Sequence, residues 1–473
     1  MTALWSEGAG GALGSARPVS ADRGASDLAA SDLAASDHAA PELPSQVDLA
    51  IVGAGFTGLW TAYHLLTRRP EARVAVLEAE HVGFGASGRN GGWVSALYPV
   101  GPTVLARRHG AERARAMFGA LREGVEDLGA IVEAEGIDCG YVRGGSIAVA
   151  RNAAQVTRAL AEVAESDEWG LGTRWLDRDE AHERLSAADT LGATFTPHCA
   201  RVHPRALVDA LAEAVRRRGG TIHEGVRVAD AAAGRVVLAS GQVIRATQIV
   251  RATEAYGARL PRLRRSIAPV YSLMVATEPL SPQMWATIGL QRRETFSDHR
   301  HLIIYGQRTV DDRIAFGGRG APYHRGSAIS PAFDRDEAVF AELRRTLLEL
   351  LPQLGDVSFT HAWGGPLGIA RDWHPSVAYD ASSGVARAGG YVGDGVAATQ
   401  LAGATLADLL CGLDTPRTRL PWVGHRSPDW EPEPLRWAGI NAGLRLASLA
   451  DREEQLTGRP AVVGRVLSRL TSH

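Results

Sequence analysis

The sequence predicts an α/β fold joined to an α+β region within one chain of 473 residues. Residues 47–77 have the pattern of a strand, a glycine-rich turn, a helix and a second strand, which is typical of a parallel βαβ unit. Helix and strand patterns alternate again over residues 203–250, whereas residues 263–325 are rich in short strands. We therefore expect a parallel sheet covered by helices beside a second, strand-rich region.

The first βαβ unit carries Gly53, Gly55 and Gly58 at GxGxxG spacing, directly after the expected strand 47–52. Gly53 allows a tight turn, Gly55 lets the backbone approach a pyrophosphate, and Gly58 packs the helix on the strand. The helix N-terminus offers free N–H groups and a partial positive charge to phosphates. Glu78 follows the second strand about 20 residues after the last glycine, where an acid accepts hydrogen bonds from a ribose. Together these features predict a Rossmann-type dinucleotide-binding domain.

A second loop, residues 83–92, indicates which dinucleotide is bound. It reads GFGASGRNGG and contains five glycines. A simple NAD dehydrogenase does not need such a loop directly after its second strand. The loop suits FAD, which is longer and extended and whose isoalloxazine ring must be directed at the substrate. A glycine-rich surface loop without a ligand is the alternative.

A glycine-rich turn also precedes the last helix of this region. Gly389, Gly390, Gly393 and Gly395 lead into a helix that starts near Val396. The N-terminus of that helix is a further anion site. In a flavoenzyme it stabilises the negative charge that develops at N1 and C2=O on reduction, and a ligand-free turn is the alternative.

Other elements follow from the periodicity of apolar residues. Helices are expected over residues 104–135, 152–170, 177–185, 203–220 and 334–351, strands over 144–149 and 221–231, a hairpin around Ser240 and Gly241, and a buried strand ending at Val250.

Composition excludes several classes of protein. Hydrophobic content of 45% and a net charge of −2 are ordinary for a globular protein and give no reason to expect nucleic acid as a partner. No apolar run approaches the ~18 residues of a transmembrane helix, so no membrane span is expected. No lysine is present, which excludes Schiff-base chemistry on a lysine amine. The three scattered cysteines form no metal or disulfide pattern, and with no signal-peptide pattern they favour a cytoplasmic protein.

Residues 1–46 are rich in Ala, Ser, Gly and Asp, repeat the ASDLA pattern, and contain one aromatic residue, Trp5. Such a composition cannot build a core, so we expect a disordered tail whose removal leaves flavin content and turnover nearly unchanged. A partner-binding role is the alternative.

Several segments together resemble the D-amino-acid-oxidase-like FAD-dependent oxidoreductases. They are residues 47–65, 77–93, 250–280, 361–376 and 389–409. The chain resembles most the branch of γ-glutamylputrescine and aminophosphonate oxidoreductases, and GASGRNGGW is its most branch-specific segment. The resemblance covers roughly residues 47–412.

The resemblance implies an enzyme that oxidises a C–N bond of a small amine or amino acid to an imine. Hydride passes to flavin N5, water hydrolyses the imine to a carbonyl product, and oxygen or an electron carrier accepts the electrons. It also implies a discontinuous antiparallel-sheet substrate domain beside the Rossmann-type FAD-binding domain. The expected FAD-binding segments are 47–135, 198–262 and 358–412, and the substrate domain comprises 136–197 and 263–357. A catalytically silent flavoprotein or partner subunit, and a pyridine-nucleotide dehydrogenase, are the alternatives.

The resemblance and the motifs also assign site residues. Those expected to bind FAD are Gly53, Gly55, Phe56, Thr57, Gly58, Glu78, Ala86, Ser87, Gly88, Arg89, Asn90, Gly91, Gly92, Val228, Ala252, Thr253, Gly390, Gly393, Asp394, Gly395 and Val396. Those expected in the catalytic pocket are Arg89, Asn90, Tyr271, Tyr305, Arg319, Tyr323, His324 and Trp363. No metal site is expected, and His81 and Cys199 are the candidates for a covalent flavin tether.

One departure from the family concerns the substrate. Many amino-acid oxidases place an arginine late in the substrate domain, where it binds the substrate carboxylate through two hydrogen bonds. The corresponding region here, residues 363–366, has none, although Arg371 lies nearby. The sequence therefore favours an amine without an α-carboxylate.

Residues 413–473 form an extension beyond the family-like fold. It contains Trp422 and Trp430, followed by a helix with Trp437, Ile440, Leu444 and Ala447 on one face. We expect an arm that packs across the FAD domain and ends in a mostly buried helix. A membrane-surface helix and a homodimer contact are the alternatives.

Overall fold

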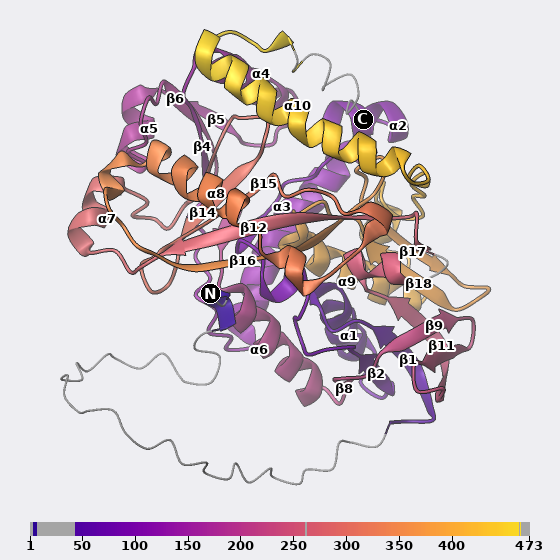
Figure 1. The fold of residues 1–473 in the computed structure, drawn as a ribbon. Coiled ribbons are helices and arrows are strands. Elements are labelled where there is room, and N and C mark those ends of the chain that lie inside the picture. Colours follow the sequence, from indigo (N-terminus) through magenta and orange to yellow (C-terminus); the bar gives the residue numbers. More distant parts are fainter. Residues whose placement is uncertain (1–2, 7–42, 261–262, 463, 465–473) are drawn as a thin grey trace, which may run out of the picture.

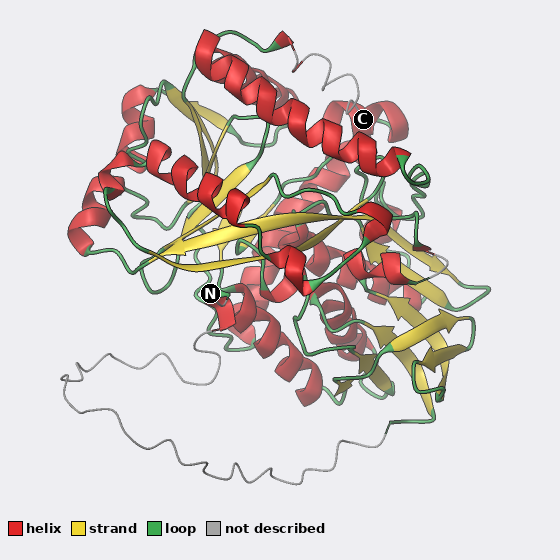
Figure 2. Cartoon of the chain, viewed as in Figure 1, coloured by secondary structure: helices red, strands yellow, loops and turns green. Residues whose placement is uncertain are grey.

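The computed structural model describes residues 3–6, 43–260, 263–462 and 464 (Figures 1 and 2). Two eight-stranded sheets each carry a hydrophobic core of their own. A small sheet of β3 (Trp93–Ser95) and β7 (Cys199–Arg201) contacts helix α9 on one side and strand β13 on the other, and so links the two halves. This arrangement confirms the predicted α/β plus α+β fold class.

The first sheet has the strand order β17-β18-β11-β1-β2-β8, with the pair β10 and β9 attached to β11. Strand β1 pairs in parallel with both β2 and β11, as the βαβ pattern predicts. The strands are β1 (Gln46–Val52), β2 (Val74–Leu77), β8 (Thr221–His223), β9 (Val228–Ala232), β10 (Arg235–Leu238), β11 (Val243–Arg251), β17 (Ser376–Asp380) and β18 (Val385–Gly389).

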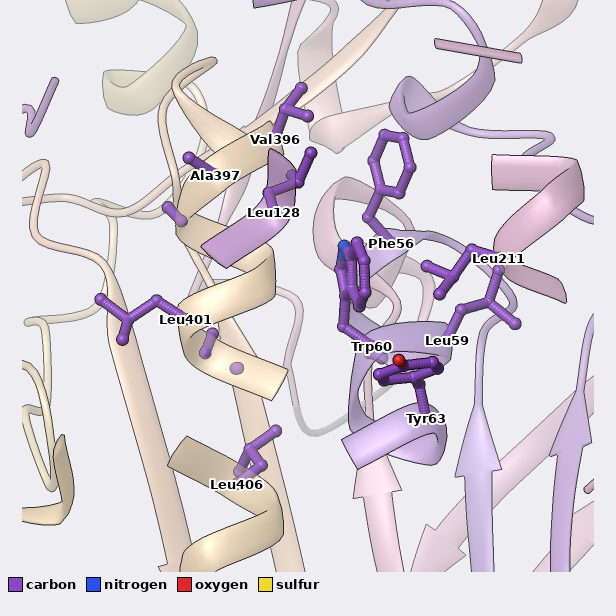
Figure 3. Packing of buried hydrophobic residues seen from close by; sticks show 14 of the residues in the cluster. Phe56, Leu59, Trp60, Tyr63, Leu128, Leu211, Val396, Ala397, Leu401 and Leu406 are labelled. Atoms are coloured by element: carbon purple, nitrogen blue, oxygen red, sulfur yellow. The ribbon is translucent and has the colours of Figure 1, made fainter. Parts of the chain in front are cut away.

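Helices cover one face of this sheet, and the β9–β10 hairpin packs on the other. The helices are α1 (Phe56–Arg68), α2 (Pro102–His109), α3 (Ala111–Ala134), α6 (Pro204–Arg217) and α9 (Gly395–Leu410). Figure 3 shows aromatic side chains of α1, among them Trp60, close to α9, with Leu211 of α6 on the other side of α1. A Cβ atom at Gly403 would lie 2.6 Å from Cβ of Trp60, so this glycine lets α9 approach α1 closely.

The second sheet has the order β16-β12-β15-β14-β13-β4-β6-β5 and is antiparallel except for the pair β13 and β4. The strands are β4 (Ser146–Ala150), β5 (Arg174–Leu176), β6 (Gly192–Thr196), β12 (Ala268–Thr277), β13 (Thr295–Asp298), β14 (Ile304–Arg308), β15 (Ile314–Arg319) and β16 (Phe359–Ile369). The associated helices are α4 (Ala153–Trp169), α5 (Arg178–Arg184), α7 (Pro282–Ile288) and α8 (Glu337–Leu350). Helix α8 packs on one face of β12 through Phe340, Leu343 and Leu347. The opposite face is turned toward the first sheet.

Strand β16 corrects a predicted boundary. We expected residues 358–412 to belong to the FAD domain, yet β16 pairs with β12 along its whole length. The chain therefore stays in the second sheet until Ile369 and returns to the first sheet only with β17. The two glycines and the proline at 364–366 weaken the strand pattern, which explains the early boundary.

Two elements are shorter than expected. The helix predicted over residues 104–135 is divided into α2 and α3 at Gly110, whose φ of +88° lies outside the helical region. The strand predicted over 221–231 is divided into β8 and β9, with Gly225 at φ +71° between them.

The prediction of a disordered tail is wrong at residues 3–6. Leu4–Ser6 form a 3₁₀ helix, η1, in which Leu4 and Trp5 are only 6% and 1% exposed. Residues 7–42 of the predicted tail lie outside the described residues, and the expectation that removal of the tail changes little no longer extends to residues 3–6. The average composition of the tail hides this apolar pair. Two such residues cannot form a core by themselves, but they can be buried against the rest of the protein.

The arm is also only partly as expected. Trp422 is fully buried in the helix-covered core of the first sheet, so this part of the arm does pack on the FAD domain. Trp430 is buried against β12 and β16 of the second sheet. Helix α10 (Leu435–Thr457) then lies over the second sheet near α4 (Figure 1).

The prediction that α10 is mostly buried is wrong. Ala447 is the one residue of the expected apolar face that is buried, and Trp437 is 44% exposed. Polar contacts hold the helix instead, because Glu454 accepts two hydrogen bonds from Arg158, at 2.8 and 2.6 Å. Asp451 accepts backbone N–H groups of His301 and Leu302. Among the described residues, no helix combines the length and the apolar character needed to cross a membrane.

Candidate active site

A cleft runs along the carboxyl ends of β1, β2 and β11, the edge at which α/β sheets bind ligands. Its empty volume is about 1330 Å³, part of it open to solvent. The predicted cofactor residues that line it are Gly53, Gly55, Phe56, Thr57, Glu78, Ala86, Ser87, Asn90, Val228, Ala252, Thr253, Gly393, Gly395 and Val396. The other predicted cofactor residues are not among the lining residues: Gly58, Gly88, Arg89, Gly91, Gly92, Gly390 and Asp394.

The turn after β1 is as compact as the GxGxxG spacing predicts. Gly53 has φ +107°, and a Cβ atom there would lie 2.6 Å from the carbonyl oxygen of Ala252. A Cβ atom at Gly58 would lie 2.0 Å from the carbonyl oxygen of Gly53. At Gly55 the added atom would lie 2.9 Å from Oγ of Ser87, so this turn and the second glycine loop are in contact. Bare backbone therefore lines the cleft where a pyrophosphate is expected.

Glu78 is fixed at the end of β2. Its Oε2 accepts the backbone N–H of Ala54 at 2.8 Å, and its Oε1 accepts that of Glu80 at 3.0 Å. The carboxylate thus stands at the cleft wall, oriented by the first glycine turn. A fixed acceptor at this position fits the ribose of FAD.

The second glycine loop, residues 83–92, is held by its own hydrogen bonds. The Asn90 amide donates to the carbonyl oxygens of Ala86 and Ser87, at 3.1 and 2.8 Å, and its oxygen accepts the N–H of Gly92 at 2.8 Å. The Ser87 hydroxyl accepts the N–H of Phe56 at the start of α1, at 2.8 Å. Asn90 therefore stiffens the loop that forms one wall of the cleft.

The Arg89 side chain extends from the loop toward the second sheet. Its guanidinium donates to Asp334 at 2.7 Å, to the carbonyl oxygen of Gly364 at 3.1 Å and to the hydroxyl of Tyr256 at 3.2 Å. It therefore ties the glycine loop to the second sheet and does not line the cleft, contrary to its predicted place in the catalytic pocket.

The sequence reasoning missed an acid at the same site, Glu254. Its carboxylate accepts the N–H of Gly390 at 2.9 Å and fills the space that a Cβ atom at Gly368 or Gly389 would need. Burial raises its pKa to about 7, against the lowering effect of the backbone N–H groups of Gly368, Gly390 and Tyr391. Its position directly after β11, at the carboxyl end of a buried parallel strand, was the available signal.

The turn before α9 completes the cleft wall. Tyr391, a second missed residue, forms a hydrogen bond of 3.2 Å with Thr57 of α1. Burial raises the pKa of Asp394, which precedes α9, to about 6, and the positive charge of Arg319 opposes that rise. Further lining residues that the sequence did not predict include Phe84, Tyr256, Pro366, Leu367 and Thr399.

Two of the predicted pocket residues lie on the sheet face toward the cleft. A Cβ atom at Gly91 would lie 2.7 Å from the ring of Tyr305, whose hydroxyl is hydrogen-bonded to Ser272 at 2.8 Å. A Cβ atom at Gly393 would lie 3.3 Å from Nη2 of Arg319. Tyr305 thus touches the second glycine loop, and Arg319 touches the turn before α9.

Tyr305 and Arg319 lie next to lining or loop glycines and are not themselves lining residues of the cleft. The other four predicted pocket residues do not line the cleft either, and each has a structural partner. Tyr271 is fully buried in the core under α8, and its hydroxyl accepts the N–H of Ser330 at 3.2 Å. The ring of His324 stacks on Phe333 at a centroid distance of 3.4 Å. The Tyr323 hydroxyl donates to Glu433 of the arm at 3.0 Å, and the Trp363 indole donates to the carbonyl oxygen of Arg89 at 2.9 Å.

The two candidate tether residues also lie away from the cleft lining. Cys199 is fully buried, with its sulfur 3.3 Å from the hydroxyl of Thr295. His81 contacts the carbonyl oxygen of Val82 through Nδ1 at 2.9 Å.

The chain belongs to the DAO family of FAD dependent oxidoreductases, whose family model matches residues 48–409. It is 28% identical over 370 residues to γ-glutamylputrescine oxidoreductase of Escherichia coli K12, covering 77% of this chain and 84% of that protein. It is 28% identical over 379 residues to the probable oxidoreductase OrdL of Rhizobium meliloti, covering 78% and 84%. Among solved structures, glycine oxidase from Geobacillus kaustophilus matches with a TM-score of 0.64 and 24% identity, over 78% of this chain and 96% of the other.

These similarities confirm the family and branch that the motifs indicated, and they establish an oxidoreductase whose cofactor is FAD. The described cleft fits that cofactor, because it joins an acid for a ribose, bare backbone for a pyrophosphate and a helix N-terminus for the flavin in one continuous space.

Proposed function

We propose that this enzyme oxidises the C–N bond of a small amine that carries an anionic group, such as a carboxylate. The imine formed is then hydrolysed to a carbonyl product. The family and the similarity to a γ-glutamylputrescine oxidoreductase support an amine as the substrate. The observation that supports an anionic group on the substrate is the position of Arg319 next to Gly393 of the cleft lining.

Among the described residues no carboxylate forms an ion pair with Arg319, although the charge of Asp394 acts on it from farther away. The Arg319 Nη2 donates to the carbonyl oxygen of Val392, and the guanidinium lies over the ring of Trp373 at 5.3 Å. Burial lowers its pKa, yet an arginine stays protonated at neutral pH. A buried cation that makes no ion pair is stabilised by an anionic ligand, so the geometry supports a substrate anion at this place.

This proposal revises the expectation from sequence. The absence of an arginine at residues 363–366 of β16 favoured an amine without an α-carboxylate. Arg319 lies on β15, the neighbour of β12 on the side away from β16, and its register partner on β12 is Ser272. An arginine can therefore serve the same cleft from a different strand of the same sheet face.

FAD supplies the two-electron acceptor for this chemistry when it is bound. The chain contributes binding and orientation. Arg319 orients the anionic end of the substrate, and its positive charge disfavours an ammonium nearby, which favours the neutral amine that C–N oxidation requires. Tyr305 and Leu367 narrow the space next to Gly91 and Gly393, respectively.

Arg319→Met tests the proposed role. It keeps a long side chain and removes the charge, so we expect KM for a carboxylate-bearing amine to rise about tenfold or more, because hydrogen bonds to charged groups contribute about 1.5–3 kcal/mol. KM for the amide-capped analogue of the same amine should change little. Steady-state kinetics on protein with measured FAD content provides both values.

Arg345→Met is the matched control, since Arg345 lies on α8 with half of its side chain exposed and pairs with Glu342 and Glu349. An Arg319→Met enzyme with unchanged KM for both substrates would show that Arg319 does not bind the substrate anion.

A further inference from the structure

The first residues of the chain lie against the active-site face of the second sheet. The N-terminal wedge, Ala3–Ser6, packs on Met274 and Ala276 of β12, Ala315 of β15 and Trp363 of β16. Met274 and Ala276 alternate with the core residues of β12 and share a face with Ser272, the register partner of Arg319. The wedge therefore covers the continuation of the surface that carries Arg319 and Tyr305.

The wedge also contacts the first half of the molecule. The ring of Trp5 meets His203 edge to face, with centroids 4.9 Å apart. His203 caps helix α6, because its Nδ1 accepts the N–H of Ala206 at 3.1 Å. Trp5 thus sits where α6, the second sheet and the glycine loop 83–92 meet. The segment Leu4–Ser6 is drawn in indigo near the end marked N in Figure 1.

Two indole groups hold adjacent carbonyl groups of that loop. The Trp5 Nε1–H donates to the carbonyl oxygen of Asn90 at 2.9 Å, and the Trp363 Nε1–H donates to that of Arg89 at 2.9 Å. The two rings are 6.0 Å apart and meet edge to face. Asn90 itself lines the cofactor cleft, so the Trp5 bond joins the wedge to the cleft wall through one residue.

We propose that Trp5 is a positioning residue of the cofactor site, which fixes the Asn90 carbonyl and thereby orders the glycine loop that contacts FAD. Asn90 stiffens the loop from within, but its side chain bonds only to loop atoms. External donors hold the two carbonyl groups that follow, because Gln307 Nε2–H donates to that of Gly91 at 2.6 Å and the Val202 N–H to that of Gly92 at 2.8 Å. The Trp5 bond supplies the corresponding anchor at Asn90. Without the indole donor, the part-buried Asn90 carbonyl group loses its partner, and FAD binding has to order the loop.

Trp5→Phe in the full-length protein tests this directly, since it keeps an aromatic ring and removes the N–H donor. Titration of the deflavinated protein with FAD, followed by flavin fluorescence, should give a Kd about fivefold higher than that of the wild type, the effect of one lost hydrogen bond. The visible absorption bands of the bound flavin should shift as well, because the environment of the loop changes.

Leu4→Ala is the control, because it removes apolar burial from the same wedge and leaves the hydrogen bond in place. It should lower the Tm of the deflavinated protein while the Kd for FAD stays within twofold of the wild type. Trp363→Phe, which removes the neighbouring donor, should resemble Trp5→Phe.

Two results would overturn the proposal. One is a Trp5→Phe protein that binds FAD as tightly as the wild type. The other is a Leu4→Ala protein whose Kd rises as much as that of Trp5→Phe, which would assign the effect to packing alone.

Discussion

Gly55→Val should yield a folded protein that carries no FAD. Gly55 has an extended backbone, with φ −85° and ψ −178°, which a valine also adopts, so the substitution does not strain the chain itself. The first added carbon would lie 2.9 Å from Oγ of Ser87, and the remainder would occupy the space in which the backbone approaches the pyrophosphate. The ratio of flavin to protein absorbance in the purified protein measures the loss.

Gly119→Val is a suitable control for this substitution. Gly119 lies in helix α3, and a Cβ atom there would meet nothing within 4 Å. That variant should keep its FAD. A yellow Gly55→Val protein with full flavin content would show that the cofactor does not approach this turn.

Trp422→Ala should destabilise the protein by about 3–5 kcal/mol, the range for truncation of a large buried aromatic side chain. Trp422 is fully buried beside Tyr98, and its carbonyl oxygen accepts the N–H of Val377 of β17 at 3.1 Å. The arm therefore extends the core of the first sheet, although it follows the residues that the family model matches. Thermal or urea unfolding of the FAD-loaded enzyme measures the change.

Trp437→Ala is the matched control, because the side chain of Trp437 is 44% exposed on α10. Its free energy of unfolding should change by less than about 0.5 kcal/mol. Equal effects at the two tryptophans would contradict the division of the arm into a buried segment and an exposed helix. Truncation after Leu413 should be more severe than Trp422→Ala and give insoluble or flavin-poor protein.

The cofactor half of the site was predictable because its determinants are local. Strand β1, the glycine turn, helix α1 and Glu78 follow one another within residues 46–78, and each element has its own signal in the sequence. Glu254 was missed because no motif surrounds it in the sequence. It joins the site only because the fold brings Gly368 of β16 and Gly389 of β18 next to its carboxylate.

The substrate half was less predictable. All ten residues of β12 are buried, so the strand shows no alternation that would tell which side faces the cleft. Tyr271 was therefore expected in the pocket although it belongs to the opposite face, with α8. Arg319 and Tyr305 were identified by residue type, and the structure alone places them beside the cleft.

The two ends of the chain depend on contacts that no sequence period encodes. Trp5 reaches Asn90, which is 85 residues away, and Glu454 reaches Arg158 at a separation of 296 residues. Helix α10 is held largely by polar contacts such as the Arg158–Glu454 ion pair, so its apolar pattern overstated how much of the helix is buried. Such long-range polar partners become visible only when the fold is known.

Anaerobic mixing of the FAD-loaded enzyme with small molecules tests the proposed C–N oxidation most directly. The panel comprises polyamines, amino acids, aminophosphonates and amino sugars. Each compound is tested in parallel with the hydroxy compound in which oxygen replaces the reacting nitrogen. Loss of the visible flavin absorption reports hydride transfer. We predict bleaching by an amine that carries an anionic group, with release of a carbonyl product and of ammonia or an amine, and no bleaching by its hydroxy counterpart. Bleaching by 2-hydroxy acids and by no amine in the panel would contradict C–N oxidation.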